Sequence, residues 1–369
     1  MTPSPIPLFD SSADFSRHGD DYRKAVEDVL RSGRFILGPQ LAAFEEEVAT
    51  YLGSRNAIGV NSGTDALTIG LRALGVGAGD EVITTSFTFF ATAEAISNVG
   101  GVPVFVDIEP SSLNLDPKAV ATAITPRTRA IMPVHLFGRA AEMGDFLGLA
   151  EHHKLLVIED TAQAFGAGHQ GSKLGSLGDL GAFSFFPTKN LGGFGDGGLI
   201  ATNDDSVAEE ARMLRTHGSM VKYQNEKLGY NSRLDELQAA LLRIKLRHVD
   251  EANRARWDVA ASYQALLEDS DVIETPALVD VERHVFHQYT VRVKNGRRDE
   301  VRTALSNQGI ATAVYYPVPV HLLPVYASLG YRLESTEIAT QEVLSLPIWP
   351  FMPEDQIERV ADALQTAVR

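Results

Sequence analysis

One lysine has a sequence context that suits covalent chemistry. Lys189 follows the apolar run 181–186, which is typical of a buried strand, and precedes the glycine-rich stretch 191–198. Glycines let a backbone approach a ligand closely. A lysine amine forms a Schiff base with a carbonyl compound, and burial lowers its pKa so that it becomes reactive. Since most lysines are solvated surface groups, Lys189 alone predicts little.

Two carboxylates end another apolar run. Residues 155–158 are apolar and are followed by Glu159, Asp160 and, three residues later, Gln163. Ligands of open α/β sheets bind at the carboxyl ends of strands. One carboxylate there can hold a positive charge on a cofactor, with Gln163 as a nearby donor. Two solvated acids in a strand–helix loop are the alternative.

A third segment is suited to an anion. Residues 61–65, Asn-Ser-Gly-Thr-Asp, lie between an apolar strand and an apolar helix. Gly63 permits a tight turn, and the next residues begin a helix whose free N–H groups and dipole attract negative charge. An ordinary helix cap made by Ser and Thr is the alternative.

These segments need a sheet that brings them together. Short β-rich runs alternate with longer helical stretches, which predicts an α/β fold with a largely parallel sheet between helices. The predicted strands are residues 57–60, 81–85, 102–107, 130–134, 155–159, 182–185 and 198–201. The predicted helices are residues 22–31, 41–51, 65–74, 91–99 and 143–152.

The last third of the chain has a different pattern. Residues 235–267 form a long, charged helical stretch with few breakers, which suits a connector between domains. The predicted elements beyond it are strands at 288–293 and 311–315, and helices at 298–308 and from 354. We therefore expect a large domain, residues 1–247, and a smaller α/β domain, residues 248–369.

Composition excludes several classes of protein. The 369 residues carry a formal net charge of −15, which disfavours nucleic-acid binding. The absence of cysteine excludes disulfides and zinc–sulfur sites, and we predict no metal centre. The N-terminus lacks the pattern of a signal peptide, and no apolar stretch approaches the roughly 20 residues needed to cross a bilayer. We expect a cytoplasmic enzyme with no membrane partner.

In their order and spacing, the three segments resemble those of the DegT/StrS family of sugar aminotransferases. That family belongs to the fold-type I group of pyridoxal-phosphate enzymes. The similarity runs over nearly the whole chain, from residues 34–39 (Arg-Phe-Ile-Leu-Gly-Pro) to residues 343–347 (Val-Leu-Ser-Leu-Pro). It implies a PLP-dependent transferase with a mostly parallel seven-stranded sheet and a smaller C-terminal domain.

The resemblance also implies roles for single residues. Lys189 matches the Schiff-base lysine that moves the proton. Asp160 matches the acid that pairs with the protonated pyridine nitrogen and keeps the ring an electron sink. Gln163 matches the residue that hydrogen-bonds the phenolic oxygen of the cofactor. The phosphate cradle corresponds to Gly63, Thr64 and Ser184, and the stacked aromatic ring to Phe89, with Phe87 and Phe90 as alternatives.

A further match concerns the partner subunit. Asn231 corresponds to an asparagine that reaches the phosphate of the partner's cofactor, which implies a homodimer with shared active sites. A cap for the following helix is a compatible role. Arg34 and Arg233 are candidates for binding a diphosphate or the donor carboxylate, and surface ion pairs are the alternative.

The implied substrates are a nucleotide-linked keto-sugar and an amino-acid donor, usually L-glutamate. Residues 314–321 resemble the substrate-facing segment of members that aminate carbon 3, and Tyr316 and His321 are its candidate contacts. Many of those members have His where Tyr315 stands here, so carbon 4 of a 4-keto-6-deoxyhexose is the alternative.

The same fold is compatible with two further functions. A relative that uses the cofactor for dehydration has histidine in place of the lysine, which Lys189 contradicts. A non-catalytic regulatory protein would show loss of the cofactor site. The lysine, acid, glutamine and phosphate cradle are all present, so the sequence favours an aminotransferase.

Overall fold

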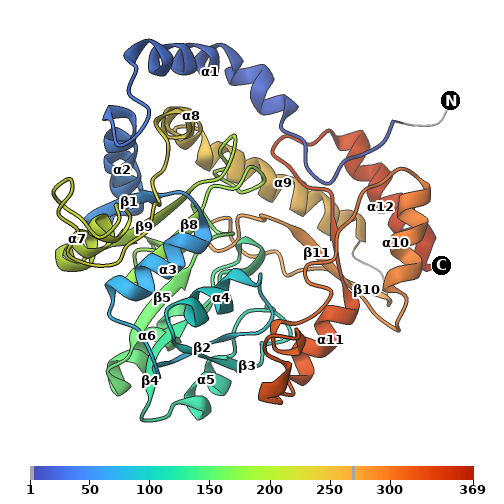
Figure 1. The fold of residues 1–369 in the computed structure, drawn as a ribbon. Helices are drawn as coiled ribbons and strands as arrows, with labels where there is room; N and C mark the ends of the chain where they lie inside the picture. Colours follow the sequence, from blue (N-terminus) through green and yellow to red (C-terminus); the bar gives the residue numbers. More distant parts are fainter. Residues whose placement is uncertain (1–3, 268–270) are drawn as a thin grey trace.

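The structure, a computed structural model, describes residues 4–267 and 271–369 (Figure 1). Within those residues its main sheet has seven strands in the order β1-β9-β8-β5-β4-β2-β3. They are β1 (Asn56–Val60), β2 (Glu81–Thr85), β3 (Val102–Val106), β4 (Thr128–Met132), β5 (Leu156–Asp160), β8 (Leu180–Ser184) and β9 (Gly198–Thr202). Each lies within two residues of its predicted strand, which confirms the predicted fold class.

The direction of the strands brings two predicted site segments to one edge. β9 is antiparallel to β1 and to β8, whereas β5 is parallel to β8 and to β4. Asp160 pairs with Ala182 across β5 and β8, and the N–H of Thr161 donates to the carbonyl of Ala182 at 2.9 Å. The ends of both strands therefore lie side by side, and the chain leaves β8 directly towards Lys189.

Side chains along each strand alternate between two apolar layers, as the pleat requires. In β5, Ile158 packs into one layer and Val157 into the other, and in β8 Leu180 and Phe183 do the same. The first layer is covered by α3 (Gly63–Ala73), α4 (Ala91–Asn98) and α7 (Asp205–Leu214). The second is covered by α2 (Pro39–Leu52), α5 (Pro117–Ala123), α6 (Met143–His153) and α8 (Glu236–Leu246). Burial on both faces explains the continuous apolar runs of these strands.

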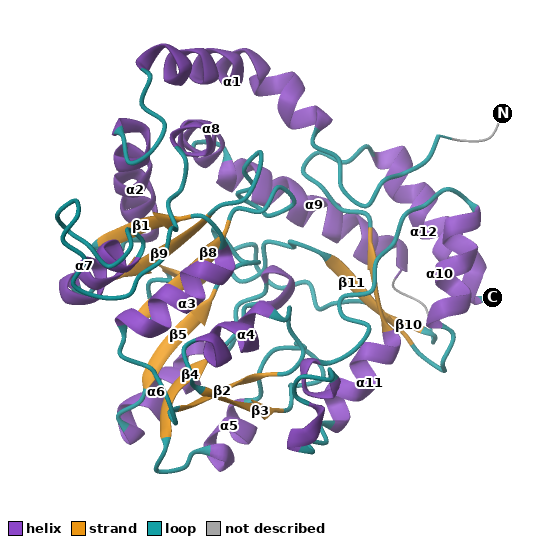
Figure 2. Cartoon of the chain, viewed as in Figure 1, coloured by secondary structure: helices purple, strands orange, loops and turns teal. Residues whose placement is uncertain are grey.

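A smaller unit lies beyond the main sheet. Its antiparallel sheet has, in the described part of the chain, the order β10 (Ile273–Glu274), β11 (Tyr289–Val293), β12 (Val343–Leu346). Its helices are α10 (Arg298–Asn307), α11 (Glu334–Glu342) and α12 (Glu354–Val368). α9 (Val249–Leu267) shares its core and extends towards the large sheet (Figure 2).

The beginning of the chain packs with this smaller unit. Ile6 is buried in its core, and the N–H of Ile6 donates to the carbonyl of Gly309 at 2.9 Å. The first described residues and the C-terminus lie on this side of the molecule (Figure 1). The division at residue 247 stays a prediction, whereas the packing joins the first residues to the C-terminal unit.

Three predicted elements differ from the structure. α1 (Ser12–Ser32) begins at Ser12 rather than at residue 22. The helical stretch 235–267 is divided into α8 and α9, because the N–H of His248 closes a tight turn onto the carbonyl of Lys245 at 3.0 Å. The predicted strand 311–315 is wrong, since Ala313 makes only an isolated bridge with Ser345 of β12.

A short hairpin of β6 (Gly168–His169) and β7 (Ser172–Lys173) precedes β8. Among the described residues, no helix combines the length and the apolar character needed to span a bilayer.

Candidate active site

Lys189 lies on a tight turn just after β8. Its N–H donates to the carbonyl of Phe186 at 2.8 Å. A Cβ atom at Gly192 would lie 2.3 Å from the carbonyl oxygen of Pro187, so the loop beyond the lysine can fold this closely only with glycine. Burial lowers the pKa of Lys189 to about 8, against the opposing charge of Asp160. A neutral, nucleophilic amine is therefore well populated near pH 8.

Asp160 ends β5 with a buried carboxylate, only 4% exposed. Its Oδ2 accepts the hydroxyl of Thr92 at 2.8 Å, and its Oδ1 accepts the N–H of Ala162 at 3.2 Å. Burial raises the pKa of Asp160, and these two hydrogen bonds and the charge of Lys189 oppose that rise. Such a carboxylate is suited to pair with a cation, for example a protonated ring nitrogen.

The amide of Gln163 has one possible orientation. Its Oε1 accepts the N–H of Phe137 at 2.8 Å, and its Nε2 donates to the hydroxyl oxygen of Tyr316 at 3.0 Å. Because a backbone N–H can only donate, the oxygen and nitrogen of the amide cannot be exchanged. Burial raises the pKa of Tyr316, so this hydroxyl keeps its proton. One N–H of Gln163 and the O–H of Tyr316 thus remain for an acceptor bound beside them.

Gly63 begins α3 directly against Ser184, the last residue of β8. A Cβ atom at Gly63 would lie 2.7 Å from Cβ of Ser184, closer than two carbon atoms pack. Ser62 caps the helix, with its hydroxyl accepting the N–H of Asp65 at 3.1 Å. The N–H groups of Gly63 and Thr64 have no acceptor in the part of the chain that the structure describes. These donors and the helix dipole suit a phosphate.

The structure separates the three candidate aromatic rings. Phe89 is 58% exposed and its ring lies 6.2 Å from that of Tyr316, beside Gln163. Phe87 is buried in the core, and Phe90 packs against Tyr326 at 6.1 Å. Phe89 is therefore the ring that is free to cover a cofactor on this side.

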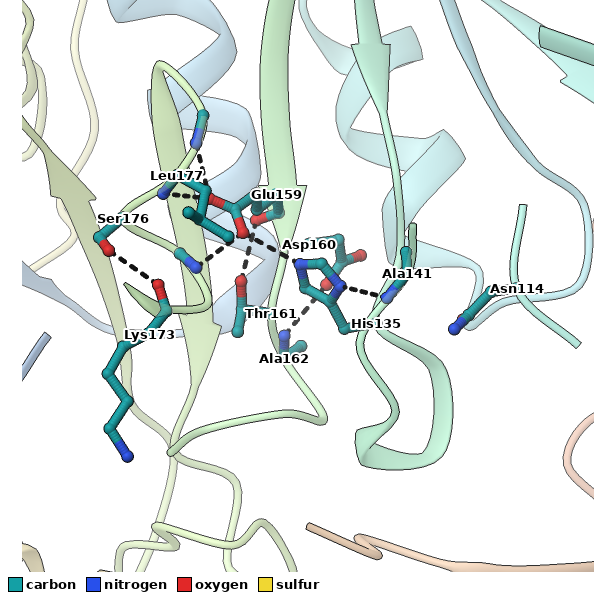
Figure 3. Close-up of polar contacts among 12 residues, drawn as sticks. Asn114, His135, Ala141, Glu159, Asp160, Thr161, Ala162, Lys173, Ser176 and Leu177 are labelled. Carbon is teal, nitrogen blue, oxygen red and sulfur yellow. Dashed lines mark hydrogen bonds and ion pairs between the residues drawn. The ribbon is translucent and has the colours of Figure 1, made fainter. Parts of the chain in front are cut away.

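Behind Asp160, the side chain of Glu159 binds the loop that precedes β8 (Figure 3). Its carboxylate is fully buried. At 2.8 Å each, it accepts three backbone N–H groups, those of Gly175, Leu177 and Gly178. One carboxylate thereby joins the strand that carries the acid to the strand that leads to Lys189.

A buried histidine completes this network. Nε2 of His135 lies 3.1 Å from Oε2 of Glu159, and Nδ1 of His135 accepts the N–H of Ala141 at 3.1 Å. The ring proton is therefore on Nε2 and is donated to Glu159. The backbone N–H of His135 donates to the carbonyl of Asp160 at 3.1 Å, which fixes the end of β5 from the other side.

Arg34 and Asn231 lie on two neighbouring exposed segments. Ile36 makes a bridge with Asp235, and the buried carboxylate of Glu236 accepts N–H groups at the start of α2. The side chains of Arg34 and Asn231 are exposed and have no polar partner among the described residues. The exposed apolar residues Phe35, Ile36 and Leu37 lie beside them.

His321 lies apart from the open site. It is 1% exposed, its Nδ1 is 2.7 Å from the hydroxyl of Ser86, and its Nε2 is 3.3 Å from Glu337. Protein partners therefore engage both ring nitrogens. The structure gives His321 a role in holding its turn against the end of β2, and its substrate contact stays a prediction.

The sequence did not predict the roles of Thr92 and His135. It also did not predict that Glu159 would bind the loop before β8 and not the cofactor. The alternation of strand side chains is the signal for Glu159, because a residue next to Asp160 must point to the opposite face. No such signal exists for Thr92 and His135. Their roles depend on how closely α4 and the segment after β4 pack against the end of β5.

Taken together, the residues fit pyridoxal phosphate. The lysine, the buried acid, the free donors at Gln163 and the cradle at Gly63 lie on adjoining strand and helix ends, as a small cofactor with a phosphate, an oxygen and a ring nitrogen requires. Among the described residues, no group of acidic, histidine or cysteine side chains could hold a metal ion.

The sequence of the chain is similar to those of known proteins over nearly its whole length. Residues 17–365 match the model of the DegT/DnrJ/EryC1/StrS aminotransferase family. A protein of Geobacillus stearothermophilus described as a pleiotropic regulatory protein is 49% identical over 364 residues, with 97% of each chain covered. A dTDP-3-amino-3,4,6-trideoxy-alpha-D-glucose transaminase of Streptomyces venezuelae is 46% identical, with 98% of this chain and 95% of the relative covered.

Solved structures of aminotransferases are also similar to the structure of this chain. DesV of S. venezuelae, in complex with a ketimine intermediate, matches with a TM-score of 0.96 and 46% identity over all of both chains. NtdA of Bacillus subtilis, with its bound cofactor PMP, matches with a TM-score of 0.92 and 34% identity over 100% of this chain and 86% of NtdA.

Proposed function

This chain belongs to the DegT/DnrJ/EryC1/StrS aminotransferase family, and we propose that it transfers an amino group to carbon 3 of a nucleotide-linked keto-sugar. The enzyme depends on pyridoxal phosphate, and the donor that we propose is L-glutamate. The transaminase of S. venezuelae supports the choice of carbon 3 through the 3-amino sugar in its name.

One observation carries the proposal. A partly buried lysine with a pKa of about 8 and a buried aspartate follow neighbouring parallel strands, and each shifts the pKa of the other. An aminotransferase needs both groups, and pKa values perturbed in this way cluster at functional sites.

Each contact to the cofactor follows from a group described above. The free N–H groups of Gly63 and Thr64, with the hydroxyl of Ser184, would bind the phosphate. Gln163 would donate its free N–H to the phenolic oxygen, and Phe89 would cover one face of the ring. Asp160 would hold the proton on the ring nitrogen.

When bound, pyridoxal phosphate supplies the electron sink that lets a proton leave the carbon bearing the amino group. Lys189, as a neutral amine, would accept that proton and return it to the carbon on the other side of the amino nitrogen. Its lowered pKa suits both directions of transfer near neutral pH. Tyr316 keeps its proton and can donate it to an oxygen of the acceptor sugar.

We also propose a homodimer in which Asn231 completes the partner's site. The exposed segment with Phe35, Ile36 and Leu37 supplies apolar surface for such a contact. Arg34 and Arg233 on the same edge are suited to the diphosphate or to the donor carboxylate.

The first test is an absorption spectrum of the purified protein with pyridoxal phosphate, before and after glutamate. We expect a visible band that shifts on glutamate addition and is absent in Lys189→Ala. Lys118→Ala is the matched control, because Lys118 is exposed on α5.

The aminated protein is then mixed with 3-keto and 4-keto sugar nucleotides, and the products are identified by NMR. A 3-amino product supports the proposal. A 4-amino product would show that the enzyme aminates carbon 4 of the sugar and not carbon 3. Because one relative is described as a regulatory protein, the test has a further outcome, in which the protein takes up no pyridoxal phosphate. That result would overturn the enzymatic function.

A further inference from the structure

A chain of two buried hydroxyls ends on the carboxylate of Asp160. Thr92, in the first turn of α4, is 1% exposed, and its Oγ1 donates to Oδ2 of Asp160 at 2.8 Å. Thr88, 3% exposed, has its Oγ1 2.9 Å from Oγ1 of Thr92. The first of these contacts reaches the acid that we assign to the ring nitrogen, and the second extends the chain by one more buried hydroxyl.

The direction of donation in this chain is determined. A threonine hydroxyl carries one proton, and a carboxylate can only accept. Since the proton of Thr92 goes to Asp160, the proton between the two threonines must come from Thr88. The order is therefore Thr88 to Thr92 to Asp160, and it holds for the ionised carboxylate. A hydroxyl whose own oxygen accepts a hydrogen bond becomes a stronger donor.

The backbone of Thr92 also holds the turn that carries an aromatic ring. Phe89 lies between the two threonines, and its carbonyl accepts the N–H of Thr92 at 3.2 Å. The turn that presents the exposed ring of Phe89 is thus fastened to the end of β5 through Thr92. The acid and the ring, two groups on different elements, share one buried attachment.

We propose that Thr92 is a positioning residue whose hydroxyl keeps Asp160 ionised and directed at the cofactor nitrogen, while its backbone N–H fixes the turn of Phe89 relative to that acid. This inference rests on the proposed function in one respect, the presence of pyridoxal phosphate. The other groups that face Asp160 are Lys189, His135 and Tyr316, and none of them is changed in the test.

The test compares Thr92→Val, which keeps the shape and removes the hydroxyl, with Thr92→Ser, which keeps the hydroxyl. Thr84→Val is the matched control, because Thr84 is equally buried and donates to the carbonyl of Met132 at 2.8 Å instead. The affinity for pyridoxal phosphate and the pH midpoint of the visible band are measured. We expect Thr92→Val to bind about tenfold more weakly, the effect of losing one charge-assisted hydrogen bond. Its band should titrate at higher pH, because the ring nitrogen loses its proton more easily and its positive charge then no longer lowers the pKa of the Schiff-base nitrogen.

A second measurement does not need the cofactor. In the apoprotein, thermal unfolding of the Val and Ser variants is followed against pH. The difference in stability between them should widen as pH rises through the titration of Asp160, since the ionised carboxylate gains more from the hydroxyl than the protonated form does.

Equal binding and equal midpoints in Thr92→Val and the wild type would overturn the proposal, as would equal losses in the Val and Ser variants, which would indicate packing alone. If the wild type takes up no pyridoxal phosphate, the proposed function fails. The apoprotein measurement still decides the coupling of Thr92 to Asp160, because a pH-independent gap would contradict it.

Discussion

A methyl group on Gly63 would lie 2.7 Å from Cβ of Ser184, so the start of α3 and the end of β8 are in direct contact. The first turn of one element and the last residue of the other thereby form a single surface. That surface carries the N–H groups that we assign to the phosphate.

Gly63→Ala should therefore weaken the binding of pyridoxal phosphate. The added methyl displaces the helix start from Ser184, and the loss of one charge-assisted hydrogen bond corresponds to about tenfold in affinity. Titration of the apoprotein measures the effect. Gly148→Ala on α6 is the control, since a Cβ there meets no atom within 4 Å. Unchanged affinity in Gly63→Ala would show that the phosphate is not bound at the start of α3.

Lys189→Met should stabilise the apoprotein at neutral pH. The folded state lowers the pKa of Lys189 to about 8 from its ordinary value of 10.5, so the unfolded state binds the proton more tightly. Between these values the unfolded chain holds more protons, and the stability of the wild type rises with pH. The advantage of the methionine variant should shrink over that window. Melting temperatures from pH 7 to 10.5 test this, and an advantage that is constant with pH would contradict it.

Glu159→Gln should lower the free energy of unfolding by about 3 kcal/mol. The amide replaces an oxygen that accepts backbone N–H groups by a donor, and three N–H groups in the loop before β8 depend on this carboxylate. Urea denaturation measures the change. Glu151→Gln, at an exposed position of α6, should be neutral. A loss no larger than that of the control would show that the network is dispensable.

Two inactive variants should restore each other if the sites are shared. Lys189→Ala supplies an intact Asn231, and Asn231→Ala supplies an intact Lys189. A mixed dimer then has one complete site, and random mixing gives about a quarter of wild-type activity. Co-expression with two purification tags and a glutamate-dependent assay checks this. No recovery in the isolated mixed dimer would place Asn231 in its own subunit's site.

Much of the fold can be predicted because its strands are buried on both faces. Such strands are short, apolar and separated by helices, so β5 and β8 are visible as continuous runs. The first half of α1 cannot be predicted in this way, because residues 12–21 are mostly polar. Arg17 of that segment pairs with Glu251 at 3.0 Å and lies over the ring of Phe351, contacts that no local pattern indicates.

For the candidate site, too, some residues can be predicted from the sequence and others cannot. Lys189, Asp160 and Gly63 lie at ends of predicted elements, and their surroundings follow from the turn and strand chemistry of a few adjacent residues. His321 shows the limit of that approach. Its segment stands out in the sequence, but whether its ring faces the site or Ser86 depends on how the turn packs against β2.

The place of β1 at the edge of the sheet has a consequence for synthesis on the ribosome. Asn56 pairs with Thr202 of β9, so the first strand to leave the ribosome finds its neighbour among the last of the sheet to be made. At ordinary translation rates the delay is on the order of ten seconds. During that time β1 is an apolar segment without its partner, and we expect the nascent chain to need protection from aggregation until β9 has emerged.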